Sequence, residues 1–255
     1  MLLNLNQNSL LDNVTNYWDN RAKDYSQHNQ QELQSIKRDK WKKTLLGHVP
    51  QGASKVLDVG MGPGFFAILM AKAGFQVTGI DATHNMLEQA KQNAQQANVN
   101  IDFVQGDVHQ LPFADESFDV IVTRNVTWNL QHPEQAYQEW FRVLKPNGRL
   151  INFDANWYLY LYDEQRRKAF EQDRANTAKR QIEDHYENTD THAMEAIARQ
   201  LPLSRQLRPH WDLQQLLNIG FSQFVVDTKI GERLWDDIEK INYCSTPMFM
   251  IVAQK

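Results

Sequence analysis

Short apolar runs alternate with amphipathic segments from residue 55 onward. Seven of these runs have the length and apolar content of buried strands: 55–59, 76–81, 101–107, 118–125, 148–156, 221–230 and 248–254. Helical segments separate most of the first five, which predicts βαβ units, a parallel sheet covered on both faces and right-handed crossovers. The connection between the last two runs is too short for a comfortable crossover helix. We therefore expect an α/β fold whose mostly parallel sheet carries an antiparallel pair at one edge.

Two further helices are expected before the first strand, over residues 12–27 and 30–49. In the second, apolar side chains recur on one face at a helical period: Leu33, Ile36, Trp41 and Leu45.

The alternation breaks between residues 157 and 210. Most of this stretch is strongly charged with few apolar anchors, and a short amphipathic helix is expected over residues 193–201. We therefore divide the chain into three parts. Residues 1–50 form an N-terminal helical cap, residues 51–156 and 211–255 form the sheet domain, and residues 157–210 form a helical lid insertion.

Composition and charge narrow the class of protein. The 255 residues carry 27 Lys and Arg against 31 Asp and Glu, a net charge of −4, so no global basic field attracts nucleic acid or anionic lipid. The single cysteine suits a reducing compartment, and neither a basic leader nor a membrane-length apolar stretch is present. These features predict a cytoplasmic protein. The acidic and His-containing stretch 183–192 lacks the spacing of established metal sites, so we expect a solvated lid segment there and no metal.

Three glycines at alternate positions follow the first strand, in the sequence VLDVGMGPGFF over residues 56–66. Gly60, Gly62 and Gly64 allow the chain to turn sharply and its backbone to approach a ligand closely, which a Cβ would obstruct. Ligands of open α/β sheets bind at this place, beyond the carboxyl ends of the strands. The spacing is G-x-G-x-G, not the G-x-G-x-x-G of dinucleotide-binding loops, because Phe65 occupies the position of the third glycine. The helix N-terminus that follows can receive a carboxylate.

Two acids at the ends of later strands indicate the other parts of the ligand. Asp81 ends the second strand, where a carboxylate can accept hydrogen bonds from a ribose diol. Asp107 ends the third strand, where it could accept from the exocyclic amine of adenine while the amide of Val108 donates to the ring and Met86 covers one face. A carboxylate, a ribose and an adenine together describe S-adenosylmethionine.

At these motifs the chain resembles the class I S-adenosylmethionine-dependent methyltransferases, most closely the small-molecule enzymes that include the ubiquinone and menaquinone C-methyltransferases. The resemblance rests on VLDVGMGPG, GID, GDVHQLPFADESFDVIV and RVLKPNGRL, and covers about residues 15–155. It implies a doubly wound, seven-stranded Rossmann-like sheet and S-adenosyl-L-methionine as cofactor, with S-adenosyl-L-homocysteine as product. The implied cofactor residues are Asp58, Gly60, Gly62 and Gly64 for the methionine moiety, Asp81 for the ribose, Met86, Asp107 and Val108 for the adenine, and the carbonyl of Asn125 for the amino group. Met61 departs from the usual Cys or Ser, from which we expect only a local packing change.

The N-terminal helix offers a further cofactor contact. Tyr17, Arg21 and Tyr25 are spaced four apart and share one helical face. Such a helix folds over the cofactor in related enzymes, so Arg21 could pair with its carboxylate and the tyrosines could screen the sulfonium. The alternative is a packed surface helix with an exposed arginine.

Candidates for the chemistry follow the fourth and fifth strands and precede the last helix. The predicted catalytic residues are Asp154, Asn125 and His210, although Asp154 could equally cap the next helix. The predicted substrate residues are Trp128, Trp157, Tyr158, Tyr162 and Arg208, of which the aromatic ones could form a wall for a cation or a ring, or pack the lid. Methyl transfer is an in-line displacement, so the protein need mainly align the reactants and exclude water.

The sequence thus predicts a methyltransferase that acts on a small molecule. Two alternatives remain open: an RNA or protein methyltransferase, and a non-catalytic protein that binds S-adenosylmethionine. We expect a small-molecule substrate, no nucleic acid and no membrane insertion, with a homodimer as an option. The sequence names neither the acceptor nor the atom that is methylated.

Overall fold

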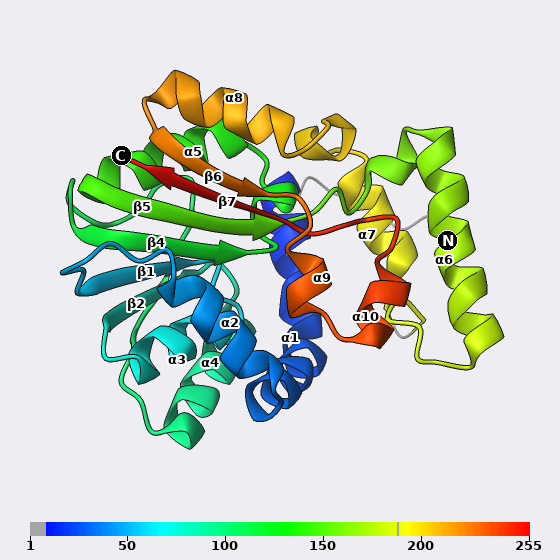
Figure 1. The fold of residues 1–255 in the computed structure, drawn as a ribbon, viewed down its shortest axis with the longest axis horizontal. Helices are drawn as coiled ribbons and strands as arrows, with labels where there is room; N and C mark the ends of the chain where they lie inside the picture. Colours follow the sequence, from blue (N-terminus) through cyan, green and yellow to red (C-terminus); the bar gives the residue numbers. More distant parts are fainter. Residues whose placement is uncertain (1–8, 188) are drawn as a thin grey trace.

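A twisted seven-stranded sheet forms the centre of the molecule (Figure 1). The structure is a computed structural model that describes residues 9–187 and 189–255, so the first eight residues of the predicted cap and residue 188 of the predicted lid lie outside the described residues. The spatial order is β3-β2-β1-β4-β5-β7-β6. The strands are β1 (Lys55–Val59), β2 (Gln76–Asp81), β3 (Asp102–Gln105), β4 (Phe118–Arg124), β5 (Leu144–Asp154), β6 (Ser222–Asp227) and β7 (Phe249–Gln254).

The first five strands pair in parallel, as the βαβ pattern predicts, and the strand order reverses between β1 and β4. β7 runs antiparallel to both β5 and β6. The expected antiparallel pairing at this edge is confirmed, with the antiparallel strand β7 one place inside the edge strand β6. The connection between these strands also holds two short helices that the pattern did not predict, α9 (Gly231–Leu234) and α10 (Asp237–Asn242).

Helices cover both faces of the sheet (Figure 1). On one face lie α2 (Lys37–Leu46), α3 (Phe65–Lys72) and α4 (His84–Ala97), and on the other α5 (Pro133–Val143) and α8 (His210–Ile219). The core of the first face is aromatic, because Trp41 packs edge-on against Phe66 and Phe153. On the second face Trp140 and Tyr137 are completely buried.

The N-terminal segment differs from the prediction. A single helix, α1 (Leu10–Gln34), runs where a break near residue 28 was expected, and it begins with a capping box between Ser9 and Asp12. The break falls instead at Ser35, whose hydroxyl bonds to the carbonyl of Glu32 and the amide of Lys37. Because the helix axis changes there, Ile36 does not share the face of Trp41 and is 75% exposed.

Residues 157–210 are mainly helical and lie beyond the carboxyl ends of the parallel strands (Figure 1). They contain α6 (Glu164–Arg180), α7 (Thr191–Ala198) and two short 3₁₀ turns, η2 (Leu159–Leu161) and η3 (Pro202–Arg205). None of the described helices is both long and apolar enough to cross a membrane.

Candidate functional site

The loop between β1 and α3 turns through three glycines with positive φ. Gly60 has φ of +61°, and a Cβ there would lie 2.5 Å from a methyl carbon of Val126, across the point where the strand order reverses. Gly62 has φ of +52°, and a Cβ there would meet only Tyr25 and Met86, at 3.7 and 4.0 Å. The loop therefore needs glycine at position 60 for packing, and at position 62 its bare backbone faces the space under α1.

Met61 is accommodated by a glycine on the neighbouring strand. Its side chain is 5% exposed and occupies the space that a Cβ of Gly79 would fill, since that Cβ would lie 2.1 Å from the Met61 sulfur. The unusual residue is thus absorbed by local packing.

Two buried carboxylates hold this loop. Asp81 accepts hydrogen bonds from the amides of Gly62, at 2.8 Å, and Thr83, at 2.9 Å, one on each oxygen. Asp58 accepts from the amide of Ala67 in the first turn of α3, at 2.8 Å. Burial raises the pKa of both, that of Asp58 to about 8. Each oxygen of Asp81 keeps a lone pair for a further donor.

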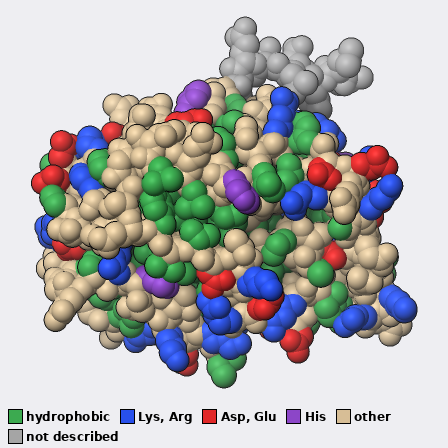
Figure 2. Space-filling model, turned by 45° about the horizontal axis from the view of Figure 1, so that its top comes forward, with side chains coloured by type: hydrophobic (Ala, Val, Ile, Leu, Met, Phe, Trp, Pro, Cys, Tyr) green, Lys and Arg blue, Asp and Glu red, His purple; other side chains and the backbone are tan. Residues whose placement is uncertain are grey.

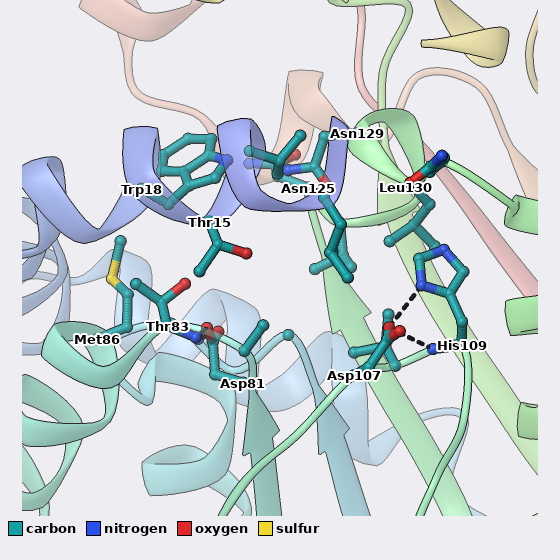
Figure 3. A pocket seen from close by; sticks show the side chains of 18 of the residues that line it. Thr15, Trp18, Asp81, Thr83, Met86, Asp107, His109, Asn125, Asn129 and Leu130 are labelled. Atoms are coloured by element: carbon teal, nitrogen blue, oxygen red, sulfur yellow. Dashed lines mark hydrogen bonds and ion pairs between the residues drawn. The ribbon is translucent and has the colours of Figure 1, made fainter. Parts of the chain in front are cut away.

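Asp107 is paired with a histidine that sequence analysis did not single out. One Asp107 oxygen lies 2.6 Å from Nδ1 of His109 and accepts from its amide at 2.9 Å (Figure 3). The amide of His132 donates to Nε2 of His109, at 3.2 Å. Because Nε2 accepts, the proton of the neutral ring belongs on Nδ1, which donates to Asp107. The second Asp107 oxygen remains available.

These residues surround a pocket beneath α1, the first pocket. Figure 3 shows Thr15 beneath α1, between the helix and the strand ends that carry Asp81 and Asp107, and Trp18 at the level of the helix. Eight of the predicted cofactor residues line it: Tyr25, Gly60, Gly62, Asp81, Met86, Asp107, Val108 and Asn125. Asp58 lines a smaller cavity behind the glycine loop, and Gly64 is the N-cap of α3.

Asn125 closes one end of the first pocket in a left-handed conformation, with φ of +58°. Its carbonyl accepts from Nε1 of Trp128 at 3.0 Å, while its side-chain oxygen is buried without a hydrogen-bond partner. A buried unpartnered oxygen favours a ligand that donates to it. The glycine loop, the carboxylates of Asp81 and Asp107 and the Asn125 oxygen together offer hydrogen-bonding groups that fit an adenosyl amino acid.

A second pocket adjoins the first and shares Trp18, Tyr25, Arg124 and Asn125 with it. The remaining lining comes from α1, the segments after β4 and β5, residues 185–194 and the stretch from Trp235 to Met248. The predicted substrate residues Trp128, Trp157 and Tyr158 lie here, and so do Tyr17 and Arg21, which were predicted to bind the cofactor.

A half-buried ion pair lies where the two pockets adjoin. NH1 of Arg124 bonds to both oxygens of Glu32, at 3.0 and 2.9 Å, and Nε1 of Trp41 donates to the same carboxylate at 2.7 Å. The guanidinium also lies over the rings of Trp41, Phe65 and Phe66. This pair ties α1 to the carboxyl end of β4.

Asp154 lies outside both pockets and is completely buried. It pairs with NH1 of Arg208 at 2.8 Å, and Arg208 also pairs with Asp212 at the start of α8. The amide of Trp128 and Nε1 of Trp157 both donate to Asp154, at 2.9 and 3.1 Å. Burial raises the pKa of Asp154, and the charge of Arg208 opposes this rise. The carboxylate therefore holds two aromatic walls of the second pocket in place.

The structure corrects the placement of four predicted residues. Asp154 and Arg208, expected to touch the substrate, form this internal ion pair instead. His210 is exposed at the first position of α8, and Tyr162 is 40% exposed with its hydroxyl bonded to the carbonyl of Arg199; neither lines a pocket described above. Asp154 and Tyr162 were identified because they follow the fifth strand, and Arg208 and His210 because they precede the last helix. Neither position tells which way a side chain points.

Several lining residues were not predicted. His185 and Tyr186 belong to the stretch expected to be solvated, yet both line the second pocket. Trp235, Glu239 and Tyr243 come from the β6 to β7 connection, to which no element had been assigned. The only signal for these residues was the density of aromatic side chains in two otherwise polar segments.

The order of strands, the glycine cradle and the two strand-end acids define the class of the protein as a Rossmann-like α/β protein with a nucleoside-binding edge. Residues 57–152 match the family model described as a methyltransferase domain. The chain is 38% identical over 136 residues to the ubiquinone/menaquinone biosynthesis C-methyltransferase UbiE of Bartonella tribocorum, covering 48% of this chain and 52% of that protein. It is 39% identical over 101 residues to an uncharacterized methyltransferase, YcgJ, of Bacillus subtilis, covering 39% of this chain and 40% of that protein.

Solved structures share the fold. One is a SAM-dependent methyltransferase from Aquifex aeolicus, with a TM-score of 0.54 and 18% identity over 88% of this chain and 95% of that chain. Another is phosphoethanolamine N-methyltransferase 2 of Haemonchus contortus in complex with S-adenosyl-L-methionine, with a TM-score of 0.58 and 16% identity over 84% of this chain and 52% of that chain. The chain spans about half the length of the curated relatives it matches. Residues 57–152 are thus similar to a methyltransferase domain, and the solved methyltransferase structures share the fold of the chain.

Proposed function

We propose that this protein transfers a methyl group from S-adenosyl-L-methionine to a small-molecule acceptor seated in the second pocket. The observation that carries the proposal is the junction of the two pockets. The first is lined by the residues of the cofactor motifs, and it shares Trp18, Tyr25, Arg124 and Asn125 with the second. A donor in one pocket and an acceptor in the other would meet at this junction.

The proposed cofactor roles follow the geometry. Asp81 would accept from the ribose hydroxyls, Asp107 and Val108 would read the adenine edge, and Met86 would cover the ring. The loop at Gly60 to Gly62 and the carbonyl of Asn125 would hold the methionine moiety, and Asp58 would support that loop from behind. When bound, the cofactor supplies an electrophilic methyl group on a sulfonium.

The helices at the carboxyl ends of the strands would exclude water from this junction. Residues 1–50 contribute α1, whose Tyr17, Arg21 and Tyr25 face the second pocket. Residues 157–210 contribute Trp157, Tyr158 and the segment that bears His185. We propose that these two parts form the cap and lid, so that transfer takes place in a dry cavity.

A small-molecule acceptor is supported by the relatives, which are named for ubiquinone and menaquinone biosynthesis. Because the net charge is −4, the chain does not carry the charge balance typical of proteins that bind RNA.

Calorimetry with S-adenosylmethionine and S-adenosylhomocysteine tests the first half of the proposal, and transfer of a labelled methyl group tests the second. The full chain is incubated with methyl-labelled cofactor and a cell extract, which is then separated into small molecules, RNA and protein. We expect binding of both cofactor forms and label in the small-molecule fraction.

Label in RNA or protein alone would contradict a small-molecule acceptor. Binding without transfer to any fraction would favour the non-catalytic alternative. Failure to bind either cofactor form at millimolar concentration, by a folded protein, would overturn the proposal.

A further inference from the structure

We propose that the acceptor is a small organic amine, methylated at nitrogen, and that the aromatic walls of the second pocket stabilise the positive charge that the nitrogen gains. This inference rests on the proposed function. It starts from the composition of the pocket, ten of whose lining residues are Trp or Tyr. The rings come from α1, α2 and four separate segments of the chain, so the fold gathers them from far apart in the sequence.

Several aromatic rings line the second pocket without lining the first, so a cofactor in the first pocket would not contact all of them. Trp18 and Tyr25 line both pockets, whereas Trp128, Tyr158, Trp157 and Tyr243 line only the second. The ring centroids of Trp128 and Tyr158 are 5.0 Å apart, and those of Trp157 and Tyr243 are 5.4 Å apart. Aromatic faces directed at one cavity attract a positive charge within about 6 Å of a ring centroid.

The charged side chains of the pocket are largely neutralised by one another. Glu32 is taken by Arg124, and Glu239 by Lys37 at 3.1 Å and by the amide of Asp236 at 2.8 Å. Arg21 bonds only to the hydroxyl of Tyr17, at 3.4 Å, among the described residues. No carboxylate of the lining is left to pair with an ammonium, so ring faces are the main feature that would stabilise a cation here.

The polar atoms that remain are tyrosine hydroxyls and one imidazole. Burial raises the pKa of Tyr158 and Tyr243, so both stay neutral and offer oxygens that accept from N–H groups. His185 lies with Nδ1 2.9 Å from the hydroxyl of Tyr243, and burial lowers its pKa. The imidazole thus adds a neutral polar group to the lining.

The charge of the product favours nitrogen over oxygen or carbon as the methylated atom. The lone pair of the neutral amine forms the new C–N bond as the C–S bond breaks, and the bonding pair stays on sulfur. The positive charge thus moves from sulfur to nitrogen. An N–H proton of the product can then be lost to water after release, whereas a tertiary amine yields a quaternary ammonium without proton loss. Oxygen and carbon acceptors end neutral and would gain no cation–π stabilisation from the rings.

The test compares a cation with its neutral isostere. The full chain is saturated with S-adenosylhomocysteine, and choline or 3,3-dimethylbutan-1-ol is titrated by calorimetry. The two probes share shape and hydroxyl group, but only choline is charged. We expect choline to bind at least tenfold more tightly, and the Trp157→Leu variant to lose most of this preference. The control variant is Tyr162→Leu, which changes an exposed ring outside the pocket.

Each outcome decides one proposal. If S-adenosylhomocysteine binds but the neutral alcohol binds as well as choline, or choline does not bind, the amine acceptor is refuted and the methyltransferase proposal stands. If S-adenosylhomocysteine itself does not bind, the proposed function fails first. Because the comparison of probes is made on the unaltered protein, it remains decisive even where Trp157→Leu does not fold.

Discussion

Asp81 accepts from the glycine loop with one oxygen and from the amide of Thr83 with the other, and this makes it the most informative single residue to test. An amide at this position would turn one acceptor into a donor that faces the amide of Gly62 or Thr83. We expect Asp81→Asn to weaken the binding of S-adenosylhomocysteine at least tenfold, or about 1.4 kcal/mol, by calorimetry. The exposed Asp102→Asn on β3 is the matched control. Equal affinities of the two variants for S-adenosylhomocysteine would show that Asp81 does not contribute to cofactor binding.

Asp58 makes the stability of the protein depend on pH. Its pKa is about 8 in the folded chain because it is buried, against an ordinary value of 3.8, so unfolding releases a proton between these two values. The free energy of unfolding therefore falls as pH rises through this window, by up to about 1.4 kcal/mol per pH unit from this group. Asp58→Asn removes the contribution. We expect the melting temperature of the variant to fall less between pH 5 and pH 8 than that of the unaltered protein, as followed by circular dichroism.

Other groups titrate over the same range, so the difference between the two proteins is the informative quantity. Asp102→Asn should follow the unaltered protein across the whole range. Parallel curves for Asp58→Asn and the unaltered protein would show that Asp58 is ionised at neutral pH despite its burial.

Single residues also show how far the sequence predicts the site. The spacing of Gly60, Gly62, Asp81 and Asp107 places them in one pocket, because parallel strands end at the same edge. His109 was missed because its role depends on the backbone of His132, which lies in another connection. The partnership of Asp154 and Arg208 was missed because residues 54 apart give no local signal of contact.

At the scale of elements, Arg208 joins α8 to the end of β5. Its removal would leave Asp154 and Asp212 buried without a counter-charge, at a cost of about 3 to 5 kcal/mol. We expect Arg208→Leu to lower the melting temperature by roughly 10 °C. The exposed Arg205→Leu in η3 should change it little. A similar effect of both variants would mean that the internal ion pair does not stabilise the fold.

Helix α1 covers both pockets. It is bonded to α4 through Asp19, which accepts hydrogen bonds from the amide of Asn85 at 2.9 Å and from the Asn85 side chain at 2.6 Å. We expect S-adenosylhomocysteine to slow amide hydrogen exchange in residues 14–25, because a ligand beneath the helix opposes its opening. Exchange in α6, which lines neither pocket, should not change. Equal protection of both helices would instead indicate global stabilisation.

The elements themselves were predictable to unequal degrees. α4, α5 and α8 follow from hydrophobic periodicity, because each has one buried face, whereas α3 and the central strands follow from continuous apolar runs. The break at Ser35 was not predictable from periodicity, since polar residues on both sides suit a continuous helix equally well. α9 and α10 have only four and six residues, too few for a periodic pattern.

For the whole molecule, charge argues against a nucleic-acid acceptor. On the face in Figure 2, basic and acidic side chains mix along the margins while apolar ones gather toward the middle. With a net charge of −4, we expect no retention on heparin and no shift of a tRNA pool at about 0.15 M salt. A protein that retains tRNA under these conditions would revive the macromolecular alternative.

Helix α1 covers both the first and the second pocket. We therefore expect the entry and exit of the cofactor and of the acceptor to depend on the same movement of α1. One opening of α1 would admit the cofactor and the acceptor, and a later opening would release S-adenosylhomocysteine and the methylated product. Turnover would then be limited by how often α1 lifts, and added viscogen would slow the steady state while leaving a single-turnover methylation unchanged.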